Sequence, residues 1–227
     1  MRNKTVPGSK HSTTSGIRQQ PGPIRDVLLT FTGILLFAGF IHQPKPLLLL
    51  AIGGLAGTAA VIGFSSRYMT IPEVFGVKRL NQKLIFYALA AIVLGVVLGL
   101  LTRKRFDLTL IPSGFTGVAF VAPLVGATEE LVFRGYIQGH LRPIGKVFSI
   151  ITASALHTSY KLLVILSLAI PLQFDFFFLI FWTFVGGILI GILRELSGNT
   201  IPPVIAHAIF DIVFYGGLAS APVWVWS

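Results

Sequence analysis

The sequence contains no cysteine, and it has few charged residues of either sign. The absence of cysteine excludes disulfides, thiol catalysis and cysteine-ligated zinc or iron–sulfur sites. Only 11% of the 227 residues are charged, whereas 54% are hydrophobic. This balance excludes an ordinary soluble globular domain.

The hydrophobic residues are concentrated in long runs without Asp, Glu, Lys or Arg: residues 27–44, 46–66, 84–102, 108–128 and 176–193. Each run is close to the length of about 20 residues that a helix needs to cross a bilayer. The runs do not alternate like the strands of a barrel, so we predict an all-α fold, a polytopic transmembrane bundle of about seven to eight helices. The predicted helices cover residues 27–41, 47–64, 84–101, 114–140, 147–160, 176–193 and 202–217. The stretch 162–172 predicts a half-helix or an extension of its neighbour, and 72–80 an interfacial or loop segment.

The chain divides into a tail and a membrane domain. Residues 1–25 are rich in Ser, Thr, Gly, Pro, Gln and basic residues, which predicts a disordered basic cytoplasmic tail. Residues 26–227 form the predicted transmembrane domain. Within it, residues 26–113 are accessory helices without unusual polar residues, and residues 114–217 carry polar residues at membrane depth. We expect the function to reside in this second part.

The net charge of +10 arises mainly from basic residues at the ends of the apolar runs. Such residues act as topology signals, so no nucleic acid partner is predicted, and the lipid bilayer is the expected surroundings. With seven crossings and the tail inside, most basic residues fall on the inner side, whereas Lys161 and the Arg103 to Arg105 cluster fall outside. The short loops and basic tail favour a plasma (inner) membrane protein with a cytoplasmic N-terminus.

Two adjacent carboxylates and an arginine follow the run that ends at residue 128. Glu130 and Arg134 would share one helix face, while Glu129 would point about 100° away. One carboxylate can therefore pair with the guanidinium, and the other is available as a general base. A structural ion pair at the membrane interface fits the same short pattern.

Two further helices carry isolated polar residues. His157 lies in an otherwise neutral apolar segment, and His207 and Asp211 share a face at i, i+4 spacing. Each residue alone is compatible with a structural hydrogen bond, but ionisable groups in a membrane are costly enough that their clustering favours one site. His11, His42 and His140 lie in the tail or near helix ends and are not included.

Together these residues resemble the CAAX-protease and bacteriocin-processing enzyme family (CPBP, or Abi) of intramembrane endopeptidases. The resemblance covers residues 116–215. It rests on the sequence EELVFRG from Glu129, on His157, and on the sequence SGNTIPPVIAHAIFD that ends at Asp211, in family order. The glycine-bearing helix with Gly186, Gly187 and Gly191 is also similar, and its small residues permit close helix packing.

The resemblance implies that residues 114–217 form the catalytic core of a glutamic endopeptidase whose substrate is a membrane-associated peptide or protein. By this resemblance Glu129 is the base, His157 positions the water, His207 and Asp211 face the oxyanion, and Glu130 with Arg134 form a supporting pair. No cofactor is expected. A zinc-dependent version also fits Glu and His as ligands, although no His-Glu-x-x-His spacing supports it.

The chain departs from the family pattern at two positions. Ala153 stands where the family usually has Phe, which we expect to change only the packing of the pocket. Asp211 stands where the family often has Asn, and an ionised Asp cannot donate a hydrogen bond. Asp211 would therefore stabilise an oxyanion only if protonated, and would otherwise orient His207. These departures motivate an alternative function, a catalytically silent scaffold or immunity-type protein. A transporter with a proton path is a further alternative.

Overall fold

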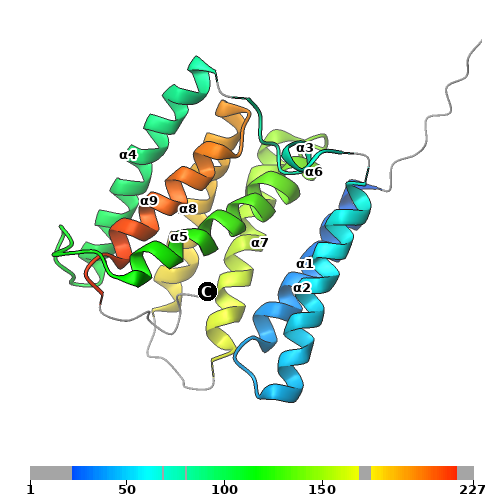
Figure 1. The fold of residues 1–227 in the computed structure, drawn as a ribbon, viewed down its shortest axis with the longest axis horizontal. Helices are drawn as coiled ribbons and strands as arrows, with labels where there is room; N and C mark the ends of the chain where they lie inside the picture. The colour runs from blue at the N-terminus through cyan, green and yellow to red at the C-terminus, as the bar shows by residue number, and fades with distance from the viewer. Residues whose placement is uncertain (1–21, 68, 80, 169–174, 219–227) are drawn as a thin grey trace, which may run out of the picture.

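The computed structural model describes residues 22–67, 69–79, 81–168 and 175–218, and all regular secondary structure in these ranges is helical (Figure 1). The predicted all-α fold is therefore confirmed. The helices are α1 (Pro23–Phe40), α2 (Lys45–Ser65), α3 (Ile71–Val74), α4 (Gln82–Arg105), α5 (Gly117–Glu130), the π-helix η1 (Leu131–Ile137), α6 (Gln138–Leu141), α7 (Lys146–Leu166), α8 (Phe176–Ser197) and α9 (Ile201–Tyr215). Helices α2, α4, α7 and α8 are long and apolar enough to cross a membrane, so the chain is a multi-pass membrane protein.

Each predicted helix has a counterpart, but some boundaries differ. The helix predicted over residues 114–140 starts at Gly117 and is interrupted by η1. The helix predicted over residues 147–160 continues to Leu166, so the start of the stretch 162–172 extends its neighbour, while residues 169–174 lie outside the described ranges. Most of the predicted tail also lies outside them. The prediction is wrong for residues 23–25, which already belong to α1.

The helices pack into two groups around α7 (Figure 1). Helices α1 and α2 form a hairpin, and α1 also contacts α7. On the other side, α9 packs against both α4 and α5, and α8 packs against α7. Helix α7 therefore lies between the hairpin and the group that contains α9.

Glycines allow the backbones to approach closely within both groups. In the hairpin, a Cβ atom on Gly33 of α1 would lie 2.6 Å from the carbonyl oxygen of Gly54 in α2. In the other group, a Cβ atom on Gly99 of α4 would lie 2.8 Å from the Cβ atom of Val213 in α9. Small residues are what membrane helices use to pack closely, because hydrophobic burial gives them little attraction within lipid.

The sequence predicts that Arg103 is a charge flanking a helix end. The structure shows instead that Arg103 is buried and hydrogen-bonded. It is 2% exposed, and its Nη1 donates to the carbonyl oxygens of Phe214 at 2.9 Å and Gly216 at 2.6 Å. These carbonyls lie at the end of α9, where the last turn has no partners within the helix. Arg103 therefore ties the C-terminal end of α9 to the end of α4.

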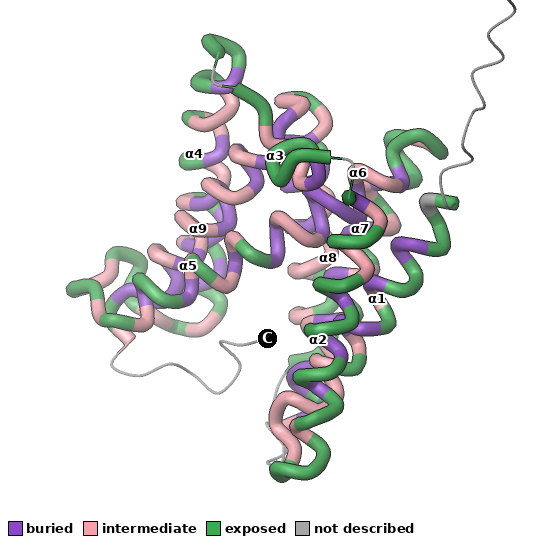
Figure 2. The backbone as a smooth tube through the Cα atoms, turned by 45° about the vertical axis from the view of Figure 1, so that its right-hand side comes forward, coloured by how far each residue is buried: buried purple, intermediate pink, exposed green. Residues whose placement is uncertain are grey.

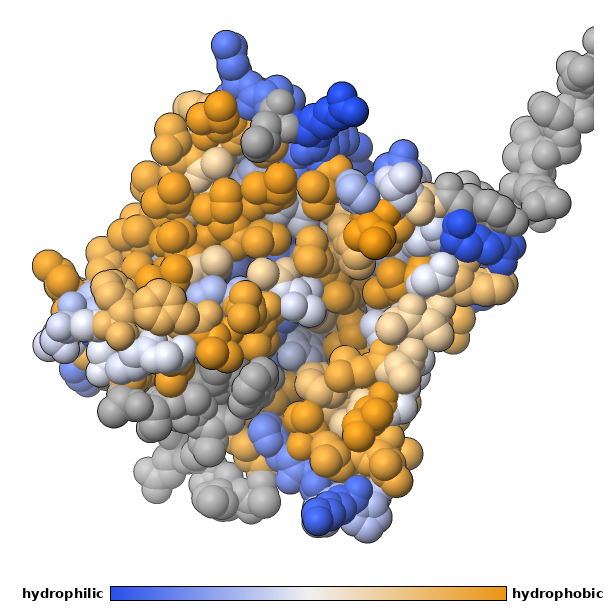
Figure 3. All heavy atoms as spheres, viewed as in Figure 1, coloured by the Kyte–Doolittle hydropathy of each residue, from blue (hydrophilic) through white to orange (hydrophobic). Residues whose placement is uncertain are grey.

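The surface is apolar along the helices and polar at their ends (Figure 3). Large apolar side chains such as Leu49, Phe86 and Leu124 are exposed, as expected for helices that face lipid. Buried positions gather toward the middle of the molecule, whereas α1 and α2 are buried only at separated positions (Figure 2). Several of the buried polar residues, among them Glu129, Glu130 and His157, form the candidate site.

Candidate active site

The candidate site is built where α5, η1, α7 and α9 meet. Glu129 and Glu130 end α5, and the backbone then changes to the wider π-helix, in which five consecutive residues from Phe133 to Ile137 are buried. π-Helical turns are rare and occur frequently at functional sites. Arg134 lies within this segment and is fully buried. Arg134 and the residues beside it in the π-helix are thus surrounded by protein rather than by lipid.

Glu129 is held by two residues of α7. Its Oε2 lies 3.2 Å from Nε2 of His157, and its Oε1 accepts a hydrogen bond from Nζ of Lys161 at 2.8 Å. Oε2 also lies 3.9 Å from Nε2 of His207 in α9. One carboxylate oxygen therefore faces the Nε2 atoms of both imidazoles.

Glu130 and Arg134 form the second layer of the site. Glu130 is fully buried, and its Oε1 accepts a hydrogen bond from Nδ1 of His207 at 2.9 Å. Its Oε2 lies 3.5 Å from Nε of Arg134, as an ion pair at i, i+4 spacing. The arginine also donates from Nη2 to the carbonyl oxygen of Gly187 at 3.3 Å. Glu130 thus connects the guanidinium to the His207 imidazole.

These contacts assign the protons of the imidazoles. Nη1 of Arg134 lies 3.2 Å from Nδ1 of His157, and a guanidinium can only donate. Nδ1 of His157 must therefore accept, which places the proton of the neutral ring on Nε2, facing Glu129. In His207, Nδ1 carries the proton because its partner Glu130 is a carboxylate. Stacking on Phe133, with ring centroids 4.6 Å apart, further fixes the His157 ring.

Asp211 lies one helical turn after His207. Its Oδ1 is 3.9 Å from Nε2 of His207, so it faces the same nitrogen as Glu129 does. The His207 ring is oriented instead by the hydrogen bond that its Nδ1 donates to Glu130. Gly126 of α5 makes this arrangement fit, because a Cβ atom there would lie 2.5 Å from Oδ2 of Asp211 and 2.8 Å from Cδ2 of His207.

Glycines of α8 allow the surrounding helices to close on the site. A Cβ atom on Gly187 would lie 3.0 Å from Nη2 of Arg134, and one on Gly191 would lie 3.0 Å from Ile150 of α7. Gly186 has no atom of the described residues within 4 Å of its added Cβ position, and it lines a cavity. The predicted close packing of the glycine-bearing helix therefore occurs at Gly187 and Gly191.

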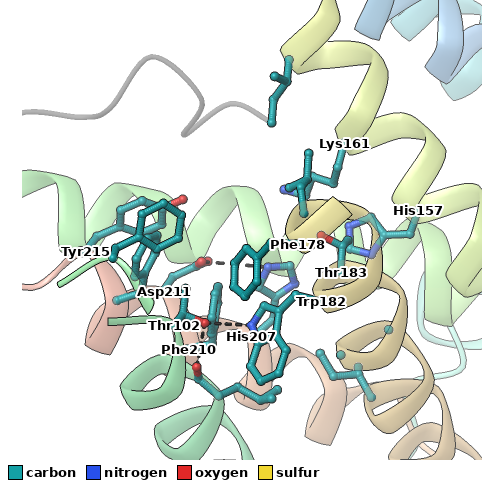
Figure 4. A pocket seen from close by; sticks show the side chains of 18 of the residues that line it. Thr102, His157, Lys161, Phe178, Trp182, Thr183, His207, Phe210, Asp211 and Tyr215 are labelled. Carbon is teal, nitrogen blue, oxygen red and sulfur yellow. Dashed lines mark hydrogen bonds and ion pairs between the residues drawn. The ribbon is translucent and has the colours of Figure 1, made fainter. Parts of the chain in front are cut away.

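The site opens into a cavity of about 150 Å³ between α4, α7, α8 and α9 (Figure 4). His157 and Lys161 of α7 lie on one side of it, and His207 and Asp211 of α9 lie on the other. The remaining wall is mainly apolar and includes six aromatic residues: Phe106, Phe178, Trp182, Phe210, Phe214 and Tyr215. The indole of Trp182 donates to the hydroxyl of Thr102 at 2.8 Å, so its polar edge is satisfied. An apolar group bound there would lie beside the polar cluster.

The structure brings all six residues of the sequence prediction together: Glu129, Glu130, Arg134, His157, His207 and Asp211. Lys161 was missed, because it was interpreted as a charge flanking a helix end. Its position four residues after His157 places both on one face of α7, and this spacing could have identified it. Across the described ranges, no group of three or more His, Asp or Glu residues has an arrangement that could hold a metal ion.

The comparisons with known proteins give one family match. Residues 111–213 match the family model described as "Type II CAAX prenyl endopeptidase Rce1-like". No curated protein and no solved structure matches the chain. The matched segment contains η1 and all six predicted residues. Residues 111–213 therefore form a domain of the Rce1-like family of type II CAAX prenyl endopeptidases, which are proteases.

Proposed function

We propose that this chain is an intramembrane endopeptidase that cleaves a membrane-associated peptide or protein with a water molecule activated by Glu129. One observation carries the proposal: Oε2 of Glu129 faces Nε2 of His157 at 3.2 Å and Nε2 of His207 at 3.9 Å, and both of these histidines line an apolar cavity. Ionisable side chains at membrane depth are costly, and their convergence on one oxygen atom is what a hydrolytic site requires.

In the proposed reaction, Glu129 takes a proton from water as the water oxygen attacks the carbonyl carbon of the scissile bond. A base positioned in this way contributes about 10²- to 10⁴-fold to the rate. His157 donates from Nε2 and holds the water beside the carboxylate. The C–N bond then breaks, and the proton held by Glu129 passes to the leaving nitrogen, which returns the carboxylate to its starting state.

The same step places negative charge on the carbonyl oxygen, and His207 is the donor suited to stabilise it as an imidazolium, which carries a proton on Nε2 as well as on Nδ1. With Nδ1 hydrogen-bonded to Glu130, the Nε2 edge of His207 faces the cavity. A proton on Nε2 would be attracted by Glu129 and by Asp211, each 3.9 Å away. In a site with few competing waters, such a donor contributes about 10²- to 10³-fold to kcat.

For the substrate we propose a peptide with an apolar group near its C-terminus, such as a prenylated cysteine in a CAAX sequence. Two observations support this class. The aromatic residues of the cavity wall, which include Phe178, Trp182 and Phe210, would bind an isoprenoid chain or a large apolar side chain. The matching family model is described by its action on CAAX prenyl proteins.

The test is a cleavage assay with the purified chain in lipid nanodiscs and an internally quenched peptide that ends in a farnesylated CAAX sequence. We expect cleavage at one peptide bond, located by mass spectrometry, and a loss of about 10²-fold or more in kcat for Glu129→Gln. Glu195→Gln is the matched control, because Glu195 binds Arg142 at 2.9 Å outside the site. Equal turnover by Glu129→Gln and the wild type would refute the proposal. The unprenylated peptide should show a higher KM.

The same assay addresses zinc. A metal-free glutamate mechanism predicts that 1,10-phenanthroline leaves turnover unchanged, whereas a zinc-dependent mechanism predicts its loss and its recovery on adding zinc.

We further propose that the end of the bundle with α3 and α6 faces the cytoplasm of a plasma membrane. The support is an excess of basic residues at that end: Arg67, Lys78, Arg79, Lys83, Arg142 and Lys146. Because the chain has no cysteine, Lys146→Cys and Lys104→Cys each introduce a single thiol at opposite ends. An impermeant maleimide added to intact cells should label the second variant only, and labelling of only the first would reverse the orientation.

A further inference from the structure

Lys161 lies on α7 one helical turn after His157, and both side chains contact Glu129. The two residues bind different oxygens of the carboxylate: Nζ of Lys161 lies 2.8 Å from Oε1, and Nε2 of His157 lies 3.2 Å from Oε2. The Lys161 side chain is 14% exposed and lines the cavity. A single helix therefore fixes both ends of the catalytic carboxylate.

We propose that Lys161 is a positioning residue for Glu129, and this inference rests on the proposed function of that glutamate as the base. With Oε1 anchored by the ammonium, the carboxylate cannot rotate, and Oε2 remains directed at the Nε2 atoms of His157 and His207. Without the anchor, the same carboxylate can turn away from the water that it activates. A displacement of about 1 Å in such a site can reduce the rate by about 10²-fold.

Charge supports the same role. The site contains the carboxylates of Glu129, Glu130 and Asp211, and Arg134 pairs with Glu130. Lys161 forms the ion pair with Glu129 and also attracts Asp211 electrostatically. Because isolated charges are costly at membrane depth, Lys161 makes it possible to place the additional carboxylate of Asp211 beside the catalytic glutamate.

The geometry also limits what Lys161 does. An ammonium group donates hydrogen bonds and cannot accept one, so it cannot replace Glu129 as the base. It binds Oε1 of Glu129, whereas the imidazoles face Oε2. Lys161 therefore acts through Glu129, and its removal should lower kcat more than it raises KM.

The first test compares charge-removing and charge-preserving variants in the farnesylated-peptide assay. We expect Lys161→Met to lower kcat by about 10²-fold with KM changed less than about threefold, and Lys161→Arg to retain at least tenfold more activity than Lys161→Met. Lys146→Met is the matched control, because it makes the same change at the exposed start of α7. Full activity of Lys161→Met, or equal losses in the Met and Arg variants, would overturn the inference.

The second test restores the charge chemically. In this cysteine-free chain, Lys161→Cys provides one thiol. With 2-bromoethylamine, the thiolate sulfur displaces bromide, and the new C–S bond gives a side chain that ends in an ammonium group. With iodoacetamide, the sulfur displaces iodide and gives a neutral amide of similar length. Intact mass measures the extent of both reactions.

We expect the aminoethylated protein to be at least tenfold more active than the amide-capped protein. Equal activities would overturn the inference, and so would a thiol that neither reagent reaches in the folded protein, because Lys161 lines the cavity. The role of Lys161 and the proposed function of the chain can be refuted separately. If Glu129→Gln is inactive but Lys161→Met is fully active, only the role of Lys161 is refuted. If Glu129→Gln is active, the proposed function itself is refuted.

Discussion

Helices α2 and α7 have the same length and very different surroundings. Both have 21 residues and can cross a membrane, with mean hydropathies of 2.2 and 1.4. Other parts of the protein bury 17% of the α2 span, compared with 50% of the α7 span. The buried residues of α2 form one narrow stripe of small side chains, Ala51, Gly54 and Thr58. Those of α7 include Ser154, His157 and Tyr160.

The two helices differ in how much of their surface other helices cover. Helix α2 packs mainly against α1 and also contacts η1, where the hydroxyls of Ser65 and Tyr136 are hydrogen-bonded. Most of its side chains are exposed, so they can vary among apolar types. Helix α7 contacts α1 and α8, and its residue His157 contacts both Glu129 and Arg134. Polar residues at membrane depth are thus concentrated where protein surrounds them.

The largest effect is expected from a methyl group added beside the candidate site. Gly126→Ala should lower kcat/KM by about 10²-fold, because the new Cβ would lie 2.5 Å from Oδ2 of Asp211 and would push α5 away from α9. Gly57→Ala in α2 is the matched control, since in the part of the chain that the structure describes no atom lies within 4 Å of its added Cβ. Equal kcat/KM values for the two variants in the peptide assay would contradict the proposed difference between the two regions.

A smaller effect is expected on stability where a buried cation caps a helix. Arg103→Gln should lower the free energy of unfolding by about 2 kcal/mol, because the carbonyls of Phe214 and Gly216 lose a charged donor. Lys104→Gln changes the exposed neighbouring residue and should have little effect. Denaturant unfolding in detergent measures both. Equal stability of the two variants would show that the cap contributes nothing.

Within the hairpin, the expected effect is smaller still and does not reach the site. Thr58 of α2 donates from its hydroxyl to the carbonyl oxygen of Thr30 in α1 at 3.1 Å. Thr58→Val should lower stability by about 0.6 kcal/mol and leave kcat unchanged. Thr32→Val is the control, because the hydroxyl of Thr32 donates to the carbonyl oxygen of Leu28 within α1 and does not join the two helices. A fall in kcat for Thr58→Val would show that the hairpin is coupled to catalysis and would contradict this prediction.

The smallest effect concerns Asp175, which precedes α8 outside its membrane span. The backbone N–H of Phe178 and the guanidinium of Arg105 lower the pKa of the Asp175 carboxyl below its usual value. Its contribution to stability is therefore present above the unfolded pKa and is lost as pH falls through the lowered folded pKa. Asp175→Asn keeps a good helix cap and should flatten the stability curve below about pH 4. An unchanged acid dependence in this variant would contradict the assignment.

The helices and the six residues could be predicted from the sequence because both signals are strong in a membrane. Apolar runs of spanning length have few alternatives to a helix. Ionisable residues such as Glu129, His157 and His207 are rare at that depth and therefore stand out. The orientation in the membrane and the division at residue 113 stay predictions.

The local geometry could not be predicted in the same way. Neither composition nor periodicity distinguishes the π-helix η1 from a regular helix, yet η1 buries Arg134 and the residues beside it. Lys161 and Arg103 follow apolar segments, so each resembles a topology signal until the fold shows its partner. A basic residue next to an apolar run has two roles available, and only the packing of other helices decides between them.

The most direct test of the account concerns whether Glu129 and His157 act on one water molecule. The measurement is kcat for Glu129→Gln, His157→Ala and the double variant with the farnesylated peptide. If both residues serve the same water, the double variant should be no slower than the slower single variant, because the first substitution already removes the unit. If the two losses multiply, the residues act independently, and a shared hydrolytic water is contradicted.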